Sequence, residues 1–301
     1  MADTQVLWKV AEWYADYKSL LSSLAYKLLG SRQEADDVVQ DVFVTLQSAE
    51  PHPLSNVRAY LCKMTVNRCM NVLQSARHKR EAYVGEWLPE PWSGNYNDEP
   101  LEQLARRETI SYAMLVMLEH LSPLERAVFV LREGYGYGYD ELAELVGKSE
   151  ANCRKILSRA KQALDLYRLL PQSHAEEQEL TVDAAALEPF VAAFEQADIG
   201  KLLALMRQDA VFITDGGGKV TAVRRPVISA RRAVILLRRM STHSLHGTNI
   251  SISMLNGQPA LIFRRGKNVQ AVMCLEWVQT EEGSRIKRIY TMYNPDKLSL
   301  I

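Results

Sequence analysis

The sequence predicts two all-helical domains followed by an α+β domain shaped as a cone. Apolar residues recur at helical spacing up to about residue 81 and again over residues 101–170. A stretch rich in proline separates these two blocks, and after Pro171 the pattern changes to short β-branched runs divided by turns. Helices followed by such runs indicate an α+β fold for the last 120 or so residues.

Composition narrows the class of protein. The chain has 301 residues, of which 47% are hydrophobic, so two or three globular domains are expected. With 36 basic and 36 acidic side chains the net charge is zero, which excludes a protein that coats DNA through overall positive charge. The four cysteines form no C-x-x-C pair, so neither a metal site nor a redox site is expected, and no cofactor is predicted. Without a signal pattern or a long apolar run, we expect a cytoplasmic protein with no membrane contact.

The N-terminal helices are bounded by recognisable signals. Residues 38–46 place apolar side chains on one face of a helix, and residues 57–73 repeat that period. Prolines at 51 and 53 break the chain between them. Residues 86–100 are predicted to be a linker.

The second helical block carries a helix–turn–helix. Ser122 begins a helix with a capping box that Glu125 closes. A short helix over residues 140–146, a turn containing Gly147, and a longer helix capped by Ser149 and reaching about residue 169 then follow.

The C-terminal block reads as a helical stretch followed by a meander. The helical stretch covers residues 187–206. Strands are expected at residues 211–214, 250–253, 260–263, 269–278 and 286–292. Turns containing glycine at 216–218, 257 and 283 separate them, as hairpins require.

Three charged surfaces are candidates for binding. The second helix of the helix–turn–helix is basic and could lie in the major groove of DNA. Residues 51–80 contain six Arg or Lys, no acidic residue, and an interleaved tyrosine and asparagines, which suits single-stranded nucleic acid. Residues 34–41 are acidic and suit a basic protein partner. Taken singly, each surface also fits an ordinary solvated helix face.

Together the segments resemble a known family. EADDVVQDVFVTL, NVRAYLCKMTVNRCMNVLQSARHKR and LSPLERAVFVLREGYGYGYDELAELVGKSEANCRKILSRAKQAL are similar, in order and spacing, to the conserved segments of extracytoplasmic-function sigma factors. The resemblance implies sigma region 2 over residues 1–84, a linker over 85–104 and sigma region 4 over 105–170. It also implies two partners, the bacterial RNA polymerase core and promoter DNA.

The resemblance assigns roles by position. The residues expected to face polymerase are Asp37, Gln40, Asp41 and Phe43. Those expected to melt and read the −10 element are Arg58, Tyr60, Asn67 and Asn71. Those expected to read the −35 element are Arg154, Lys155, Ser158 and Arg159. Residues 151–153 depart from the family's usual triplet, so the −35 sequence itself is not carried over.

A narrower resemblance covers the rest of the chain. WLPEP at 87–91, DGGGK at 215–219 and NPDKL at 294–298 resemble motifs of a sigma subgroup with a C-terminal SnoaL-like domain of the nuclear transport factor 2-like fold. In this chain that domain would span residues 181–301 and regulate the sigma regions from within the same polypeptide. The residues expected to carry the regulation are Trp87, Leu88, Pro89, Asp215, Gly216, Gly217, Gly218, Lys219, Asn294, Pro295 and Asp296.

Other functions stay open at this point. A one-component repressor would use the helix–turn–helix without polymerase. A helix–turn–helix regulator could also be fused to a cone that binds a small ligand or acts as an enzyme. Asp215, His243 and His246 are the candidates for catalysis, but the two histidines lack a third metal ligand nearby, and Asp215 lies in a predicted turn. We therefore expect no enzyme.

Overall fold

The computed structural model describes residues 2–49, 54, 56–81, 83–92, 110–169, 179–299 and 301. These residues form two compact units. The first contains the described residues up to 81 and those from 114 to 167, and the second contains residues 83–92, 111–113 and 179–301. Each unit is considered by itself.

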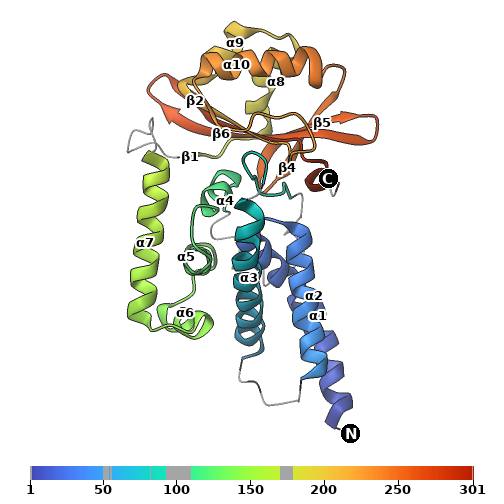
Figure 1. Cartoon of the computed structure of the whole chain (residues 1–301), viewed down its shortest axis with the longest axis vertical. Helices are drawn as coiled ribbons and strands as arrows, with labels where there is room; N and C mark the ends of the chain where they lie inside the picture. Colours follow the sequence, from blue (N-terminus) through green and yellow to red (C-terminus); the bar gives the residue numbers. More distant parts are fainter. Residues whose placement is uncertain are drawn as a thin grey trace. The chain divides into compact units, whose positions relative to one another are not determined.

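The first unit is all helical, as predicted (Figure 1). Its helices are α1 (Ala2–Leu29), α2 (Arg32–Ser48), α3 (Val57–Glu81), α4 (Tyr112–Leu118), α5 (Pro123–Phe129) with a π-helical turn (Val130–Gly134), α6 (Tyr139–Val146) and α7 (Glu150–Leu169). The first two residues of α4 and the last two of α7 belong to the second unit. The predicted capping box is present, because the Ser122 hydroxyl accepts from the Glu125 amide while the Glu125 carboxylate accepts from the Ser122 amide. Gly147 ends α6 with φ 64°, a left-handed conformation that glycine adopts without strain.

One core joins the helices of this unit. The predicted apolar face of α2 is buried, including Val38, Val42 and Leu46. Helix α1 also contacts the segment after α4: the Arg126 guanidinium donates to the Leu28 carbonyl at 2.8 Å, and the hydroxyls of Ser23 and Tyr135 lie 3.0 Å apart. The two predicted sigma regions are therefore packed against each other.

The second unit is α+β, as predicted. It contains β1 (Glu179–Leu180), a 3₁₀ turn (Ala184–Leu187), α8 (Glu188–Glu195), α9 (Ile199–Ala204), β2 (Met206–Asp215), β3 (Val227–Ile228), α10 (Ala230–Arg239) with a π-helical turn (Met240–Ser244), β4 (Asn249–Leu255), β5 (Gln258–Arg265), β6 (Asn268–Thr280), β7 (Gly283–Met292) and α11 (Pro295–Leu298).

The sheet confirms the expected meander for β4 to β7, which pair in sequence order as antiparallel neighbours, and corrects it for β2. Its order is β3-β2-β7-β6-β5-β4, with β1 also paired to β6. Strand β2 runs parallel to β7, so the sheet is mixed. A parallel pair needs a long crossover, and here α10 and the strands β4 to β6 lie between the two partners in sequence. The hairpin expected at Gly216 joins no second long strand. Instead, the Thr214 hydroxyl donates to the Val223 carbonyl and accepts from the Val223 amide, both at 3.0 Å.

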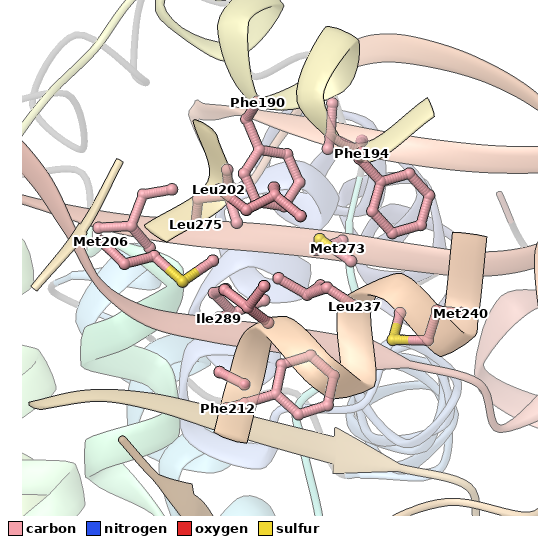
Figure 2. Packing of buried hydrophobic residues seen from close by; sticks show 14 of the residues in the cluster. Phe190, Phe194, Leu202, Met206, Phe212, Leu237, Met240, Met273, Leu275 and Ile289 are labelled. Atoms are coloured by element: carbon pink, nitrogen blue, oxygen red, sulfur yellow. The ribbon is translucent and has the colours of Figure 1, made fainter. Parts of the chain in front are cut away.

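The core of this unit lies between the sheet and its helices. Helices α8, α9 and α10 cover one face of the sheet (Figure 1). Figure 2 shows Phe190, Phe194 and Leu237 packed over Phe212 and Ile289. Because side chains alternate along a strand, Asp215, Glu276 and Tyr290 lie on the opposite face of the sheet.

Candidate functional site

The helix–turn–helix exposes its basic residues. On α7, Cys153, Leu157 and Ala160 are buried and hold the helix to its neighbours. The four residues predicted to read DNA are all exposed: Arg154, Lys155, Ser158 and Arg159. Ser149 begins the helix, since its hydroxyl accepts from the Asn152 amide at 3.3 Å. The exposed face of α7 therefore offers three cations and a hydroxyl to a partner.

Arg154 is held in place by two neighbours that the sequence did not single out for this role. Its guanidinium donates to the Glu150 carboxylate at 3.0 Å and lies 4.5 Å from the ring centre of Tyr139. Arg132 stacks on the same ring at 4.7 Å. The ring contacts limit the rotamers of Arg154 without removing its exposure.

The acidic surface lies on α2. Asp37, Gln40 and Asp41 are exposed. Phe43 is only 4% exposed and meets the Tyr14 ring edge-on, with the ring centres 5.0 Å apart. Phe43 therefore belongs to the core that holds α2, and a protein partner on this face would meet the three polar side chains.

The basic surface lies on α3. Asn67 and Asn71 are exposed, whereas Arg58 and Tyr60 are partly buried. Arg68 forms an ion pair with Asp41 at 3.3 Å, which links the basic and acidic surfaces. The side chains of Arg77, Lys79 and Arg80, also part of the predicted surface, lie outside the described residues.

In the second unit, Asp215 at the end of β2 binds residues 83–88. The carboxylate is 1% exposed. One oxygen, Oδ2, accepts from the Leu88 amide at 3.0 Å, and the other accepts from the Tyr83 hydroxyl at 2.6 Å and the Gly217 amide at 2.9 Å. Two predicted regulatory residues, Asp215 and Leu88, are thus hydrogen-bonded to each other.

Lys297 completes this cluster. Its ammonium, 7% exposed, donates to Asp215 Oδ2 at 2.8 Å and to the Leu88 carbonyl at 2.5 Å. It also lies 3.9 Å from the ring centre of Trp87. A buried ammonium is stable only when paired and hydrogen-bonded, and here one carboxylate, one carbonyl and the rings of Trp87 and Tyr83 surround it. We call Tyr83, Trp87, Leu88, Asp215, Asn294 and Lys297 the clasp.

Two of these clasp residues were not among the predicted site residues. Lys297 lies inside the NPDKL motif, but no role was predicted for it. Nothing in the sequence pointed to Tyr83, whose hydroxyl accepts from the Asn294 side-chain amide at 3.0 Å. Burial and the hydrogen bond to Asp215 raise the pKa of Tyr83, so it stays protonated and donates.

The rest of the linker segment is held by its backbone. The Tyr112 hydroxyl donates to the Pro89 carbonyl at 2.8 Å, and the Tyr112 ring meets Tyr290 at 5.6 Å. Trp92 exchanges two hydrogen bonds with Asn256 at the β4–β5 turn, of 2.8 and 3.1 Å. Residues 83–92 are therefore fixed at both ends across one face of the sheet.

The glycines of DGGGK allow close approach. A side chain at Gly217, φ 61°, would collide with Asn294, and one at Gly218 would press on Val84. The remaining predicted regulatory residues lie nearby: Asp296 pairs with Lys219 at 2.6 Å on the surface, and Pro295 begins α11.

The described residues offer no support for a metal site or a membrane span. Among them, no group of three or more His, Cys, Asp or Glu side chains could hold a metal ion. In the same residues, no helix is both long and apolar enough to cross a membrane.

Comparison with known families matches both helical regions. Sigma-70 region 2 matches residues 13–79, and Sigma-70, region 4 matches residues 111–164. The ECF RNA polymerase sigma factor SigJ of Mycobacterium tuberculosis is 32% identical over 242 residues, which are 79% of this chain and 76% of that protein. The chain belongs to the ECF sigma factors. Like other sigma factors it binds the RNA polymerase core and promoter DNA and directs polymerase to its promoters.

The similarity extends into the C-terminal domain of this sigma factor. A probable ECF RNA polymerase sigma factor, SigI of Mycobacterium tuberculosis, is 26% identical over 290 residues, covering 96% of this chain and 94% of that protein. The crystal structure of Mycobacterium tuberculosis SigJ aligns with a TM-score of 0.71 at 24% identity, covering 96% of this chain and 98% of that one. The predicted fold class of this sigma factor, two helical regions followed by an α+β domain, is thereby confirmed.

Proposed function

We propose that the α+β domain of this ECF sigma factor controls transcription initiation by gripping the linker between sigma regions 2 and 4. One observation carries the proposal: a buried ion pair, Asp215 with Lys297, binds both the amide and the carbonyl of Leu88. A tether with no other role would not need its backbone held by buried charges. A linker fixed over residues 83–92 limits how far the two regions can separate.

Separation matters because the two regions read distant DNA elements. The −10 and −35 elements lie more than two helical turns of DNA apart, and each turn spans about 34 Å. In the first unit the regions are packed together, with Arg126 bonded to Leu28. We infer that promoter binding requires them to part and that release of the linker favours the parted population.

The surfaces that the sigma regions would use follow from exposure and charge. We assign −35 reading to four residues of α7: Arg154, Lys155, Ser158 and Arg159. We assign −10 melting to four residues of α3: Arg58, Tyr60, Asn67 and Asn71. Polymerase binding is assigned to Asp37, Gln40 and Asp41. We also propose that region 2 ends at residue 84, that the linker ends at 104, that region 4 ends at 170 and that the α+β domain begins at 181. With polymerase and promoter DNA as partners, the protein acts in the cytoplasm.

Run-off transcription with purified core polymerase tests the proposed regulation. Asp215→Asn keeps the shape of the side chain but removes the charge that pairs with Lys297, and we expect more transcript than from the unaltered protein. Glu282→Gln is the matched control, because it removes an exposed carboxylate that pairs with Arg285 in the β6–β7 turn, and it should change little. Equal transcript from a folded Asp215→Asn protein and the unaltered protein would contradict the proposal.

A further inference from the structure

The α+β domain contains a pocket on the face of the sheet opposite the clasp. Its volume is about 720 Å³, within the range of small-molecule sites. Buried apolar side chains form its floor, among them Phe212, Met240, Leu245 and Leu298. Thr214, Leu236 and the loop 220–223 form its sides. The pocket lies wholly within the second unit.

The polar groups of the pocket indicate what it would bind. Arg239, His243 and Gln270 lie among the lining residues, and none of the described lining residues is acidic. The Tyr293 hydroxyl is buried without a partner at hydrogen-bonding geometry, although Ser244 is near enough to offset part of the pKa rise that burial causes. A buried hydroxyl with no better partner than this contact can still donate to a ligand that accepts a hydrogen bond. The lining therefore fits an apolar molecule bearing one anionic group.

The pocket shares its walls with the clasp. Thr214 lines the pocket, and the next residue of β2, Asp215, points to the other face and binds the linker. In α11, Pro295 and Leu298 line the pocket while Asn294 and Lys297 belong to the clasp. The same short segments thus position both sites.

We propose that the pocket binds a small apolar carboxylate or similar anion and that its occupancy strengthens the grip on the linker. The coupling to transcription rests on the proposed function, whereas the pocket and its coupling to the clasp do not. Because the end of β2 and α11 contribute side chains to both sites, a ligand that holds these segments in place favours the closed arrangement. By linkage, closing the clasp must strengthen ligand binding by the same factor.

Binding is tested on the full chain with 8-anilinonaphthalene-1-sulfonate, a fluorescent apolar anion. We expect saturable binding at one site, weakened about tenfold by Arg239→Gln and unchanged by Arg238→Gln, the neighbouring exposed arginine that does not line the pocket. N-phenyl-1-naphthylamine has a similar apolar body without the sulfonate, and its binding should not respond to Arg239→Gln. Leu236→Trp should block both probes. If neither Arg239→Gln nor Leu236→Trp changes the affinity for the probe, the proposed site is wrong.

Coupling is tested by hydrogen exchange of residues 83–92. The sulfonate probe should slow exchange at the Leu88 amide, and Asp215→Asn should weaken probe binding about fivefold or more. Tight binding with neither effect would overturn the inference. If both effects appear while Asp215→Asn leaves transcription unchanged, the coupling stands and the proposed regulatory function fails.

Discussion

At the scale of single residues, burial decides which charged side chains a binding partner can contact. Arg154 is exposed and stacked on Tyr139, so it is both ordered and accessible. Lys297 is buried and fully engaged, so its charge serves the structure of the clasp. Lys27 is buried against the Tyr135 ring at 4.5 Å, and burial lowers its pKa to about 8.

The recognition helix gives a prediction at this scale. Arg154→Ala should cost about 1–3 kcal/mol of binding at one base position of the promoter and relax the preference there. Binding of polymerase holoenzyme to promoters altered at single −35 positions measures the effect. Glu150→Gln is the control, because it frees Arg154 from its ion pair and should not weaken binding. If Arg154→Ala weakened binding equally on every promoter, Arg154 would contact a phosphate and not a base.

Lys27 gives a prediction for pH. Its pKa of about 8 in the folded protein is below the ordinary 10.5, so the unfolded chain binds more protons between these values. The free energy of unfolding should therefore rise as pH increases from 8 to 10.5. Below pH 8 the buried charge costs on the order of 3 kcal/mol, and Lys27→Met should recover part of it.

Chemical denaturation at pH 7 and pH 10 checks this. Lys27→Met should unfold at higher denaturant concentration at pH 7 and show a smaller gain at pH 10. Lys63→Met, at an exposed position of α3, is the control. A Lys27→Met protein with the unaltered pH profile would show that Lys27 is not the group responsible.

At the scale of elements, short segments with fixed backbone geometry place the functional groups. The DGGGK turn brings Asp215 to the linker because its glycines permit contact with Asn294 and Val84. Helix α2 presents Asp37 and Asp41 on one face because residues four apart align along a helix.

The glycine turn gives a prediction with a close control. Gly217→Ala adds a methyl group where Asn294 lies, whereas Gly266→Ala meets no atom within 4 Å. Both glycines have φ near 60°, so backbone strain is similar, and only Gly217→Ala should open the clasp. We expect faster hydrogen exchange over residues 83–92 and more transcript for Gly217→Ala alone. If the two variants gave the same exchange rates and transcript levels, backbone strain would explain the effect and the contact with Asn294 would not.

Helix α2 gives a second prediction. Changing Asp37 and Asp41 together to Lys should abolish binding to core polymerase, measured by size-exclusion chromatography. Folding should change little, because the Asp41–Arg68 pair is 61% and 47% exposed. Glu281 and Glu282, both exposed in the β6–β7 turn, make the control when changed to Lys with the same change in charge. Unimpaired binding by the α2 variant would move the polymerase contact elsewhere.

At the scale of the whole molecule, the C-terminal residues act on a segment about 200 positions earlier in the sequence. Lys297 and Asn294 hold Leu88 and Tyr83. Helix α11 and its N-cap Asn294 are thus part of the proposed regulatory contact.

Truncation tests this long-range contact. A chain ending at Tyr293 loses Asn294 and Lys297 and leaves Asp215 without its cation, which for a buried pair costs about 3–5 kcal/mol. We expect a looser linker and more transcript. A chain ending at Leu298 keeps the clasp and serves as the control. If the shorter chain is folded but no more active than this control, the C-terminal turn does not restrain transcription.

The sequence by itself determined the helical and α+β parts, the helix–turn–helix and the motifs that mark the clasp. The elements follow from local signals: apolar period, the Ser122 capping box, and turns such as Asn256–Gly257. The motifs that mark the clasp came from the resemblance to a sigma subgroup. The tertiary structure alone decided that β2 runs parallel to β7, that Phe43 is buried, and that Lys297 and Tyr83 bind Asp215 and Asn294. The pairings of β2 with β7 and within the clasp join residues 77 to 211 positions apart, and composition and spacing contain no information on which distant groups meet. Burial then sets their chemistry, since only in the folded chain does Asp215 lose its water and hold the linker instead.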